Sequence, residues 1–257
     1  MINKIKTNLE LIKQNKPLIL CLVNHVTMNT VANCLLSIGA APIMSESLDE
    51  IEELVKISHA VYINIGTLNA DFMDRVRLAC KIAKHYNKPV ILDPVGAGAS
   101  KIRTDATNEL LPFVDIIRGN ASEIMAAADA CQKTLGVESV HQVSDAIYAA
   151  RSIAKQHNII VMISGKDDFV TDGINEMEFS FGSALMPLVT GMGCRLTAVI
   201  AAFRSLNPNA YEATYLAGIY FSITGQIAED IAKTPAAFDI VFTENLFQPN
   251  WNKMKEL

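Results

Sequence analysis

Hydrophobic and polar positions along the chain follow two alternating patterns. Short runs that are apolar at nearly every position alternate with longer stretches in which apolar residues recur every three or four positions. Uninterrupted apolar runs are typical of parallel strands buried on both faces, and the longer stretches are typical of the helices that connect such strands. The pattern therefore predicts strands at 17–23, 40–44, 60–66, 88–93, 114–119 and 159–165.

Helix signals fill the spaces between these runs. The N-terminal residues form an amphipathic pattern, and residues 31–38 carry a helical period that stops at Gly39. Ser47 followed three residues later by Glu50 is a capping-box signature. Longer helices are predicted at 195–206 and 209–232.

Shorter apolar pieces follow Gly165, at 169–172, 176–181 and 184–189, and the last of them contains Pro187. Because proline cannot donate a hydrogen bond to a neighbouring strand, we expect antiparallel or edge strands here. Together the patterns predict an α/β fold with a mostly parallel central sheet and antiparallel additions near the C-terminal half.

Composition narrows the class of protein. Half of the 257 residues are apolar and 19% are charged, which allows a large core in one domain. Lys and Arg number 22 against 27 for Asp and Glu, without a basic stripe, which argues against a nucleic-acid partner. The five cysteines show no metal-binding spacing, and we find neither a signal peptide nor a membrane span. We therefore expect a cytoplasmic protein.

Polar residues and glycines follow the predicted strands. In an open parallel sheet, ligands bind beyond the carboxyl ends of the strands. The sequence therefore predicts a binding site along one edge of the sheet, where the residues that follow the strands include Asn24, Met44, Asp93, 118–120 and Ser164.

The segment 189–203 holds the sharpest chemical signal. Gly191 and Gly193 precede a predicted helix and let the N–H groups at its start approach an anion. Cys194 lies at the same helix start, where a thiol pKa is lowered, and is a candidate base or polar contact for a hydroxyl. The alternatives are a tight strand-to-helix turn and a buried, inert cysteine.

Asp93 and Glu123 are the carboxylates best placed to serve Mg²⁺, because a hard cation on a phosphate chain prefers oxygen ligands. Asn120 lies three residues before Glu123 and could face the same way. In the alternative interpretation, Asp93 starts an Asp-Pro turn and Glu123 complements a helix dipole. P-loop, dinucleotide-binding and α/β-hydrolase motifs are absent from the sequence, which removes support for those classes of enzyme.

Four segments carry a resemblance to a known family. Residues 24–45, 88–100, 116–124 and 189–203 resemble the hydroxyethylthiazole kinase family in order and spacing, and the likeness extends over nearly the whole chain. The resemblance implies a ribokinase-like, three-layer α/β/α sandwich in a single domain over 1–257. It also implies Mg²⁺-dependent transfer of the γ-phosphoryl group of ATP to the hydroxyethyl group of 4-methyl-5-(2-hydroxyethyl)thiazole, in thiamine salvage.

The resemblance also implies roles for individual residues. It assigns catalysis to Cys194, Gly191 and Gly193, thiazole binding to Met44, Gly191 and Asn24, ATP binding to Arg118, Ser164 and Asn120, and Mg²⁺ to Asp93 and Glu123. It further implies a homotrimer with the substrate site at the subunit interface, beside an apolar surface formed partly by Val26, Met28 and Met44. The alternative for these three residues is internal core.

The residue at position 194 separates subclasses within the resemblance. Ribokinase-like relatives usually carry Asp there, and the thiazole kinases are known for Cys. Because a thiol accepts a proton from an alcohol poorly, we expect the acceleration to come mainly from in-line positioning and charge neutralisation, and we expect Cys194→Asp to retain or raise activity.

Two other functions remain open at this point. One is a sister kinase for another alcohol, such as hydroxymethylpyrimidine or a sugar, which would normally carry Asp at position 194. The other is a non-catalytic protein that binds thiazole or nucleotide. The presence of Asp93, Glu123 and both glycines argues against a silent binder.

Overall fold

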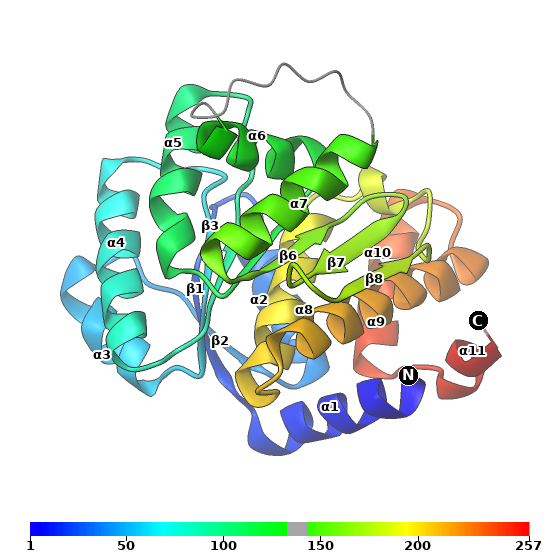
Figure 1. Ribbon diagram of the computed structural model, residues 1–257. Helices are drawn as coiled ribbons and strands as arrows, with labels where there is room; N and C mark the ends of the chain where they lie inside the picture. Colours follow the sequence, from blue (N-terminus) through cyan, green and yellow to red (C-terminus); the bar gives the residue numbers. More distant parts are fainter. Residues whose placement is uncertain (133–142, 257) are drawn as a thin grey trace.

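The computed structural model describes residues 1–132 and 143–256 (Figure 1). Over these residues eight strands form one sheet in the order β2-β1-β3-β4-β5-β6-β7-β8. Neighbouring strands are parallel from β2 to β6, and β7 and β8 pair in antiparallel fashion at the far edge. The strands are β1 Leu18–Leu22, β2 Ala41–Ile43, β3 Ala60–Asn64, β4 Val90–Asp93, β5 Ile116–Gly119, β6 Ile160–Ile163, β7 Asp168–Thr171 and β8 Glu176–Phe179.

Helices cover both faces of this sheet. Figure 1 shows α3, α4 and α5 on one side and α1, α8, α9 and α10 on the other. The helices are α1 Ile2–Asn15, α2 Met28–Ile38, α3 Ile51–Ile57, α4 Ala70–His85, α5 Lys101–Leu110, α6 Ala121–Gln132, α7 Val143–His157, α8 Met192–Leu206, α9 Ala210–Ile231, α10 Pro235–Phe247 and α11 Trp251–Glu256. Short 3-10 turns lie at Leu48–Glu50, Leu111–Phe113 and Met186–Leu188.

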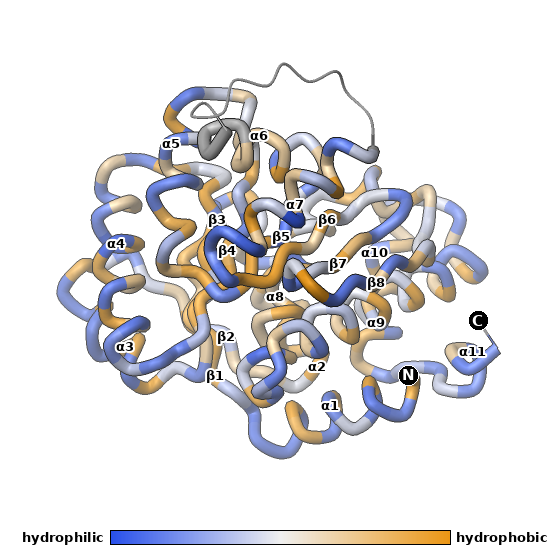
Figure 2. Tube along the Cα trace, viewed as in Figure 1, coloured by the Kyte–Doolittle hydropathy of each residue, from blue (hydrophilic) through white to orange (hydrophobic). Residues whose placement is uncertain are grey.

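Two hydrophobic cores explain why the strands are apolar without alternation. Ile19 and Cys21 of β1 join the core under α2, α8 and α9, whereas Leu20 and Leu22 join the core under α3 and α4. Successive side chains of a strand point to opposite faces, so a strand between two helix layers needs apolar residues at every position. Apolar residues accordingly gather along the strands in the middle of the molecule (Figure 2).

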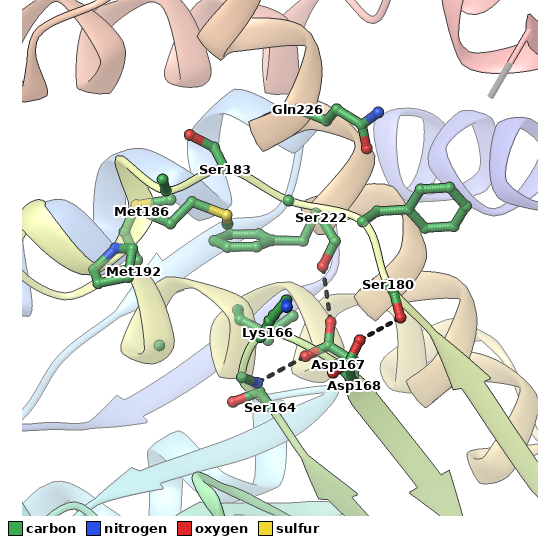
Figure 3. Close-up of a pocket in the computed structure, with 18 of the residues that line it drawn as sticks. Ser164, Lys166, Asp167, Asp168, Ser180, Ser183, Met186, Met192, Ser222 and Gln226 are labelled. Carbon is green, nitrogen blue, oxygen red and sulfur yellow. Dashed lines mark hydrogen bonds between the residues drawn. The ribbon is translucent and has the colours of Figure 1, made fainter.

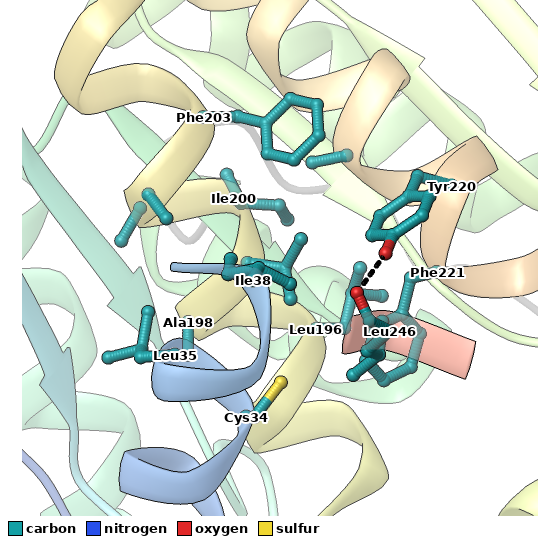
Figure 4. Packing of buried hydrophobic residues seen from close by; sticks show 14 of the residues in the cluster. Cys34, Leu35, Ile38, Leu196, Ala198, Ile200, Phe203, Tyr220, Phe221 and Leu246 are labelled. Carbon is teal, nitrogen blue, oxygen red and sulfur yellow. Dashed lines mark hydrogen bonds between the residues drawn. The ribbon is translucent and has the colours of Figure 1, made fainter. Parts of the chain in front are cut away.

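Helix α8 is the most deeply buried helix of the second layer, because α2, α9 and α10 pack around it and its neighbours (Figure 4). Leu196, Ile200 and Phe203 of α8 are at most 4% exposed. The hydroxyl of Tyr220 donates to the Leu246 carbonyl at 2.6 Å, which satisfies a polar group inside this core. The packing fixes the N-terminus of α8 against the carboxyl edge of the sheet.

The predicted α/β/α sandwich with antiparallel strands near the C-terminal half is confirmed, but three local predictions are wrong. Residues 184–189 contain a 3-10 turn at Met186–Leu188 instead of a strand, because Pro187 suits the first turn of a helix and removes a donor from a ladder. The helix predicted from position 195 begins at Met192. Ser47 caps a 3-10 turn, but Glu50 bonds the Ser45 hydroxyl, so no capping box closes.

Within the described part of the chain, no helix combines the length and the apolar character that crossing a bilayer requires.

Candidate active site

Polar side chains meet where the parallel strands end at the N-terminus of α8. They come from the ends of three strands, β1, β3 and β4, and from the first two turns of the helix. A buried amide lies at the centre of this group: Asn64 donates to Asp93 Oδ2 at 2.9 Å, to Cys194 Sγ at 3.2 Å and to the Tyr62 hydroxyl at 3.1 Å. We refer to Asn24, Tyr62, Asn64, Asp93, Cys194 and Thr197 as the polar network.

The orientation of the Asn64 amide is set by two donors on its other side. Its Oδ1 accepts from Asn24 Nδ2 at 2.8 Å and from the Gly66 backbone N–H at 3.0 Å. With the oxygen occupied, the amide nitrogen must face the carboxylate and the thiol. Asn64 was not among the residues predicted from the sequence, although an asparagine inside an otherwise apolar strand is a signal that could have identified it.

Asp93 is fully buried within the network. Its Oδ2 accepts from Asn64, from the Tyr62 hydroxyl at 3.3 Å and from the Thr197 hydroxyl at 3.2 Å. Its Oδ1 has no hydrogen-bond partner and lies 3.7 Å from Arg118 Nη1. Burial raises the pKa of Asp93 to about 6, although the nearby Arg118 charge opposes the rise. The side chain therefore does more than start an Asp-Pro turn, because it offers an acceptor that the protein leaves free.

Arg118 connects β5 to the first turn of α8. Its Nε donates to Ser164 Oγ at 2.8 Å, and its Nη2 contacts the same oxygen. A Cβ added at Gly193 would lie 2.5 Å from Arg118 Nη1, so the guanidinium can occupy this place only because position 193 is glycine. Gly193 lies inside the helix, contrary to the prediction that it precedes it.

Gly191 caps this helix in a conformation that favours glycine. Its φ is 83°, and a Cβ there would lie 2.8 Å from Thr27 Cγ2. Gly191 therefore brings the turn before α8 against the start of α2. The first N–H groups of α8 have no acceptor within the helix, and Gly193 in the same turn lies against Arg118, a combination that suits an anion.

Cys194 is 8% exposed and accepts from Asn64, with Asn24 Nδ2 at 3.7 Å. Burial, followed by the charge of Asp93, raises the pKa of the thiol. The predicted lowering of this pKa is therefore wrong, because loss of hydration and a neighbouring carboxylate outweigh the helix dipole. Cys194 is a neutral thiol within the polar network, and no longer a candidate thiolate.

Asn120 and Glu123 form a reciprocal cap at the start of α6. Asn120 Oδ1 accepts from the Glu123 N–H at 2.9 Å, and Glu123 Oε2 accepts from the Asn120 N–H at 2.8 Å. Glu123 Oε1 accepts from the Gly96 N–H at 2.9 Å, so this carboxylate also holds the loop that follows Asp93. The two side chains face the same way, as predicted.

A cavity of about 670 Å³ has Arg118 in its lining, whereas the residues of the polar network are not part of that lining. Figure 3 shows this cavity. Its walls come from the end of β6, the turn to β7, the segment after β8, and helices α8 and α9. Arg118, Ser164, Lys166 and Asp168 contribute polar groups to the lining, and its apolar part is formed by Phe181, Ala184, Met186, Pro187, Leu196 and Phe221.

Asp168 joins two walls of this cavity and was not predicted from the sequence. Its Oδ1 accepts from the Gly165 N–H at 3.0 Å, and its Oδ2 accepts from the Ser222 hydroxyl at 2.9 Å (Figure 3). Burial raises the pKa of Asp168 to about 6. The signal for it was weak, because Asp168 follows a glycine turn in which any polar residue is ordinary.

The apolar residues assigned to a subunit interface differ in exposure. Val26 is 69% exposed, so internal core is the wrong interpretation for it. Met28 and Met44 are half-buried and pack against the core that contains α8. Met44 follows β2 at the same edge of the sheet as the polar network.

Comparisons with known proteins agree with this architecture. The sequence model of the Hydroxyethylthiazole kinase family matches residues 9–250. A hydroxyethylthiazole kinase of Chlamydia abortus is 42% identical over 258 residues, covering 100% of this chain and 98% of the relative. One from Leptospira biflexa is 38% identical and covers 97% of this chain and 94% of the relative.

Comparisons with solved structures agree with the sequence comparisons. The structure of a hydroxyethylthiazole kinase protein from Pyrococcus horikoshii matches with a TM-score of 0.91 at 33% identity, covering 99% of this chain and 97% of that one. A Bacillus subtilis pyridoxal kinase, solved as an ADP complex, matches with a TM-score of 0.61 at 17% identity over 80% of this chain and 90% of that one, and shares the fold. The resemblance inferred from the four sequence segments is confirmed. The chain belongs to the hydroxyethylthiazole kinase family.

Proposed function

We propose that this protein transfers the γ-phosphoryl group of ATP to the hydroxyethyl group of 4-methyl-5-(2-hydroxyethyl)thiazole, as a step of thiamine salvage. One observation carries the proposal: Arg118 stands between a nucleotide-sized cavity and the polar network around Cys194. A guanidinium in that place can neutralise charge on a phosphoryl group as it passes from one side to the other.

The cavity suits a nucleotide. Its apolar walls fit a base and a sugar, and Arg118 with Ser164 lies at the end nearest the start of α8. We place the phosphate chain along Arg118, Ser164 and the first N–H groups of α8, which attract anions. Asn120 contributes by fixing the loop next to β5 through its cap of α6.

The thiazole alcohol would occupy the opposite side of Arg118, against Cys194, Asn24, Gly191 and Met44. Because Val26 is exposed beside this place, a second subunit can cover it. We therefore keep the homotrimer, with the substrate site at the subunit interface, as part of the proposal.

The carboxylates fit a magnesium ion that is bound mainly by phosphate. Mg²⁺ in kinases usually takes one or two carboxylates, with phosphate and water completing its shell. Among the described residues no group of three or more His, Cys, Asp or Glu side chains could hold a metal ion by itself. The free Oδ1 of Asp93 offers one oxygen, and Glu123 adds negative charge while it holds the loop beyond Asp93. When bound, the ion would neutralise charge on the phosphate chain.

The protein's own residues would orient the acceptor hydroxyl and stabilise the transferring phosphoryl group. Cys194 keeps its proton because its pKa is raised, so we assign it to contact and orientation of the acceptor hydroxyl instead of to proton removal. Arg118 and the N–H groups of α8 stabilise the transferring group, and Asn64 holds the thiol and Asp93 in fixed relation.

Four described cysteines are buried and unpaired, which supports a cytoplasmic setting.

The test is an acceptor-choice assay with purified protein, Mg²⁺, ATP and hydroxyethylthiazole, following ADP and thiazole phosphate together. Parallel reactions contain hydroxymethylpyrimidine, ribose or no acceptor. We expect both products only with the thiazole, and we expect EDTA and Gly191→Asp to abolish them, because a side chain at position 191 collides with Thr27. Turnover only with another alcohol would shift the substrate, and saturable binding without turnover would favour a silent binder.

A further inference from the structure

Two loops follow the strands that end in Asn64 and Asp93 of the polar network. The loop after β3 contains Gly66, whose N–H orients Asn64, and the loop after β4 begins directly beyond Asp93. One side chain from α5 reaches both loops: Arg103 donates through Nη2 to the Gly66 carbonyl at 2.8 Å and through Nη1 to the Val95 carbonyl at 2.7 Å.

The surroundings of Arg103 suit a clamp between loops better than an ion pair. Arg103 is half-buried, and it makes no salt bridge with any residue in 1–132 or 143–256. Its fork of donors is satisfied instead by carbonyls from two different loops. A planar guanidinium can hold two such acceptors at once, whereas an ammonium cannot match the same fork.

Gly96 shows that the loop after β4 is built around this guanidinium. Its φ is 79°, and a Cβ there would lie 2.6 Å from Arg103 Nη1. The Gly96 N–H donates to Glu123 Oε1 at 2.9 Å. The loop beyond Asp93 is therefore held from one side by Arg103 and from the other by Glu123.

Gly66 connects Arg103 to Asn64 through its two backbone polar groups. Its carbonyl is held by Arg103, and its N–H donates to Asn64 Oδ1. Because this bond keeps the Asn64 oxygen away from the thiol, the amide nitrogen faces Asp93 and Cys194. Release of the Gly66 carbonyl would free the turn that fixes this orientation.

We propose that Arg103 is a positioning residue for phosphoryl transfer: it clamps the loops after β3 and β4 so that Asn64 and Asp93 keep their geometry around Cys194. The inference rests on the proposed function. Arg103 does not line the cavity of Figure 3, so it acts on the reacting geometry and leaves nucleotide binding alone.

The test compares Arg103→Met, which keeps an unbranched apolar stem, with Arg103→Lys and with the control Arg77→Met. Arg77 is a half-exposed arginine that pairs with Glu109 and Asp74 on the surface. We expect Arg103→Met to lower kcat roughly 100-fold, because a misplacement of about 1 Å can cost that much, while ADP affinity by calorimetry changes less than about twofold. Arg103→Lys should recover part of kcat, and Arg77→Met should keep it.

A second measurement does not depend on the acceptor. Hydrogen exchange should accelerate at the Gly66 and Gly96 amides in Arg103→Met, and not at amides of the cavity wall such as Gly165. Unchanged exchange at Gly66 and Gly96, or an equal loss of kcat and ADP affinity, would overturn the clamp. If the wild-type protein fails to turn over the thiazole, the proposed function fails, and the exchange data alone still decide whether the clamp exists.

Discussion

The two sides of Arg118 are built in different ways. The polar network on one side is buried and held by hydrogen bonds between strand ends and the first turn of α8, so that Asp93 Oδ1 is its free carboxylate oxygen. The cavity on the other side is walled largely by turns and apolar side chains. Groups on rigid elements can be aligned before the substrate arrives, whereas a cavity between loops selects mainly by shape.

This difference implies different sensitivities for the two sides. A change that moves an atom of the polar network should lower kcat more than it lowers nucleotide affinity. A change in the cavity wall should alter nucleotide affinity or stability more than the chemical step. The predictions below test the contrast, beginning with the largest effect.

Among the variants that contrast the two sides of Arg118, Gly193→Ala should cause the largest loss of activity. Alanine normally stabilises a helix relative to glycine, but its Cβ would displace the Arg118 guanidinium, whose nearest atom lies at 2.5 Å. Because a guanidinium at the end of a flexible side chain can move, the protein should stay folded while kcat/KM falls about 100-fold. Steady-state kinetics with a melting curve measures both quantities.

The control for this prediction is Gly165→Ala, in the wall of the same cavity. A Cβ there meets nothing closer than the Asp167 carbonyl at 3.9 Å. The kcat of this variant should remain near that of the wild type. Equal losses in both variants would show that glycine flexibility, and not the place of Arg118, accounts for the effect.

Sequence and structure agree on the site where the residues follow neighbouring strands. Asp93, Arg118 and Ser164 could be brought together from the sequence, because the carboxyl ends of parallel strands meet at one edge. Arg103 could not, since its importance lies in contacts with two carbonyls that only the folded chain brings together. No local pattern of apolar and polar residues encodes a side chain that bonds two distant carbonyls.

The pKa of Cys194 is a second property that the sequence did not predict correctly. Position at a helix start predicts a lowered thiol pKa, but burial next to Asp93 reverses the sign. Burial and the identity of a charged neighbour are tertiary properties. The sequence could place the cysteine at the helix, but it could not supply its surroundings.

Asp168→Asn should raise stability by an amount that depends on pH. The pKa of Asp168 is raised to about 6 by burial, from about 3.9 in an unfolded chain. The folded state therefore holds the proton more tightly, and its stability falls as pH rises from about 4 to 6, by up to about 3 kcal/mol for this group. The variant removes this penalty and should melt a few degrees higher at pH 8 than the wild type.

At pH 4 the difference in melting temperature between Asp168→Asn and the wild type should shrink towards zero. The matched control is Asp172→Asn, because burial pushes the pKa of Asp172 upward but hydrogen bonds from Asn175 and Ile174 lower it overall. This control should lose stability at pH 8. A less stable Asp168→Asn at pH 8 would mean that the charged carboxylate, facing Arg118, stabilises the fold.

Cys194→Asp should have the smallest effect, with kcat retained or raised. Asn64 Nδ2, which now donates to the thiol at 3.2 Å, can donate to a carboxylate in the same place, and a carboxylate accepts a proton from an alcohol better than a neutral thiol does. Cys194→Ala is the matched control, and it should lose less than the roughly 100-fold that removal of a general base costs. An inactive Asp variant with an unchanged melting curve would mean that the site does not tolerate a second negative charge beside Asp93. Activity would then require a neutral side chain at position 194.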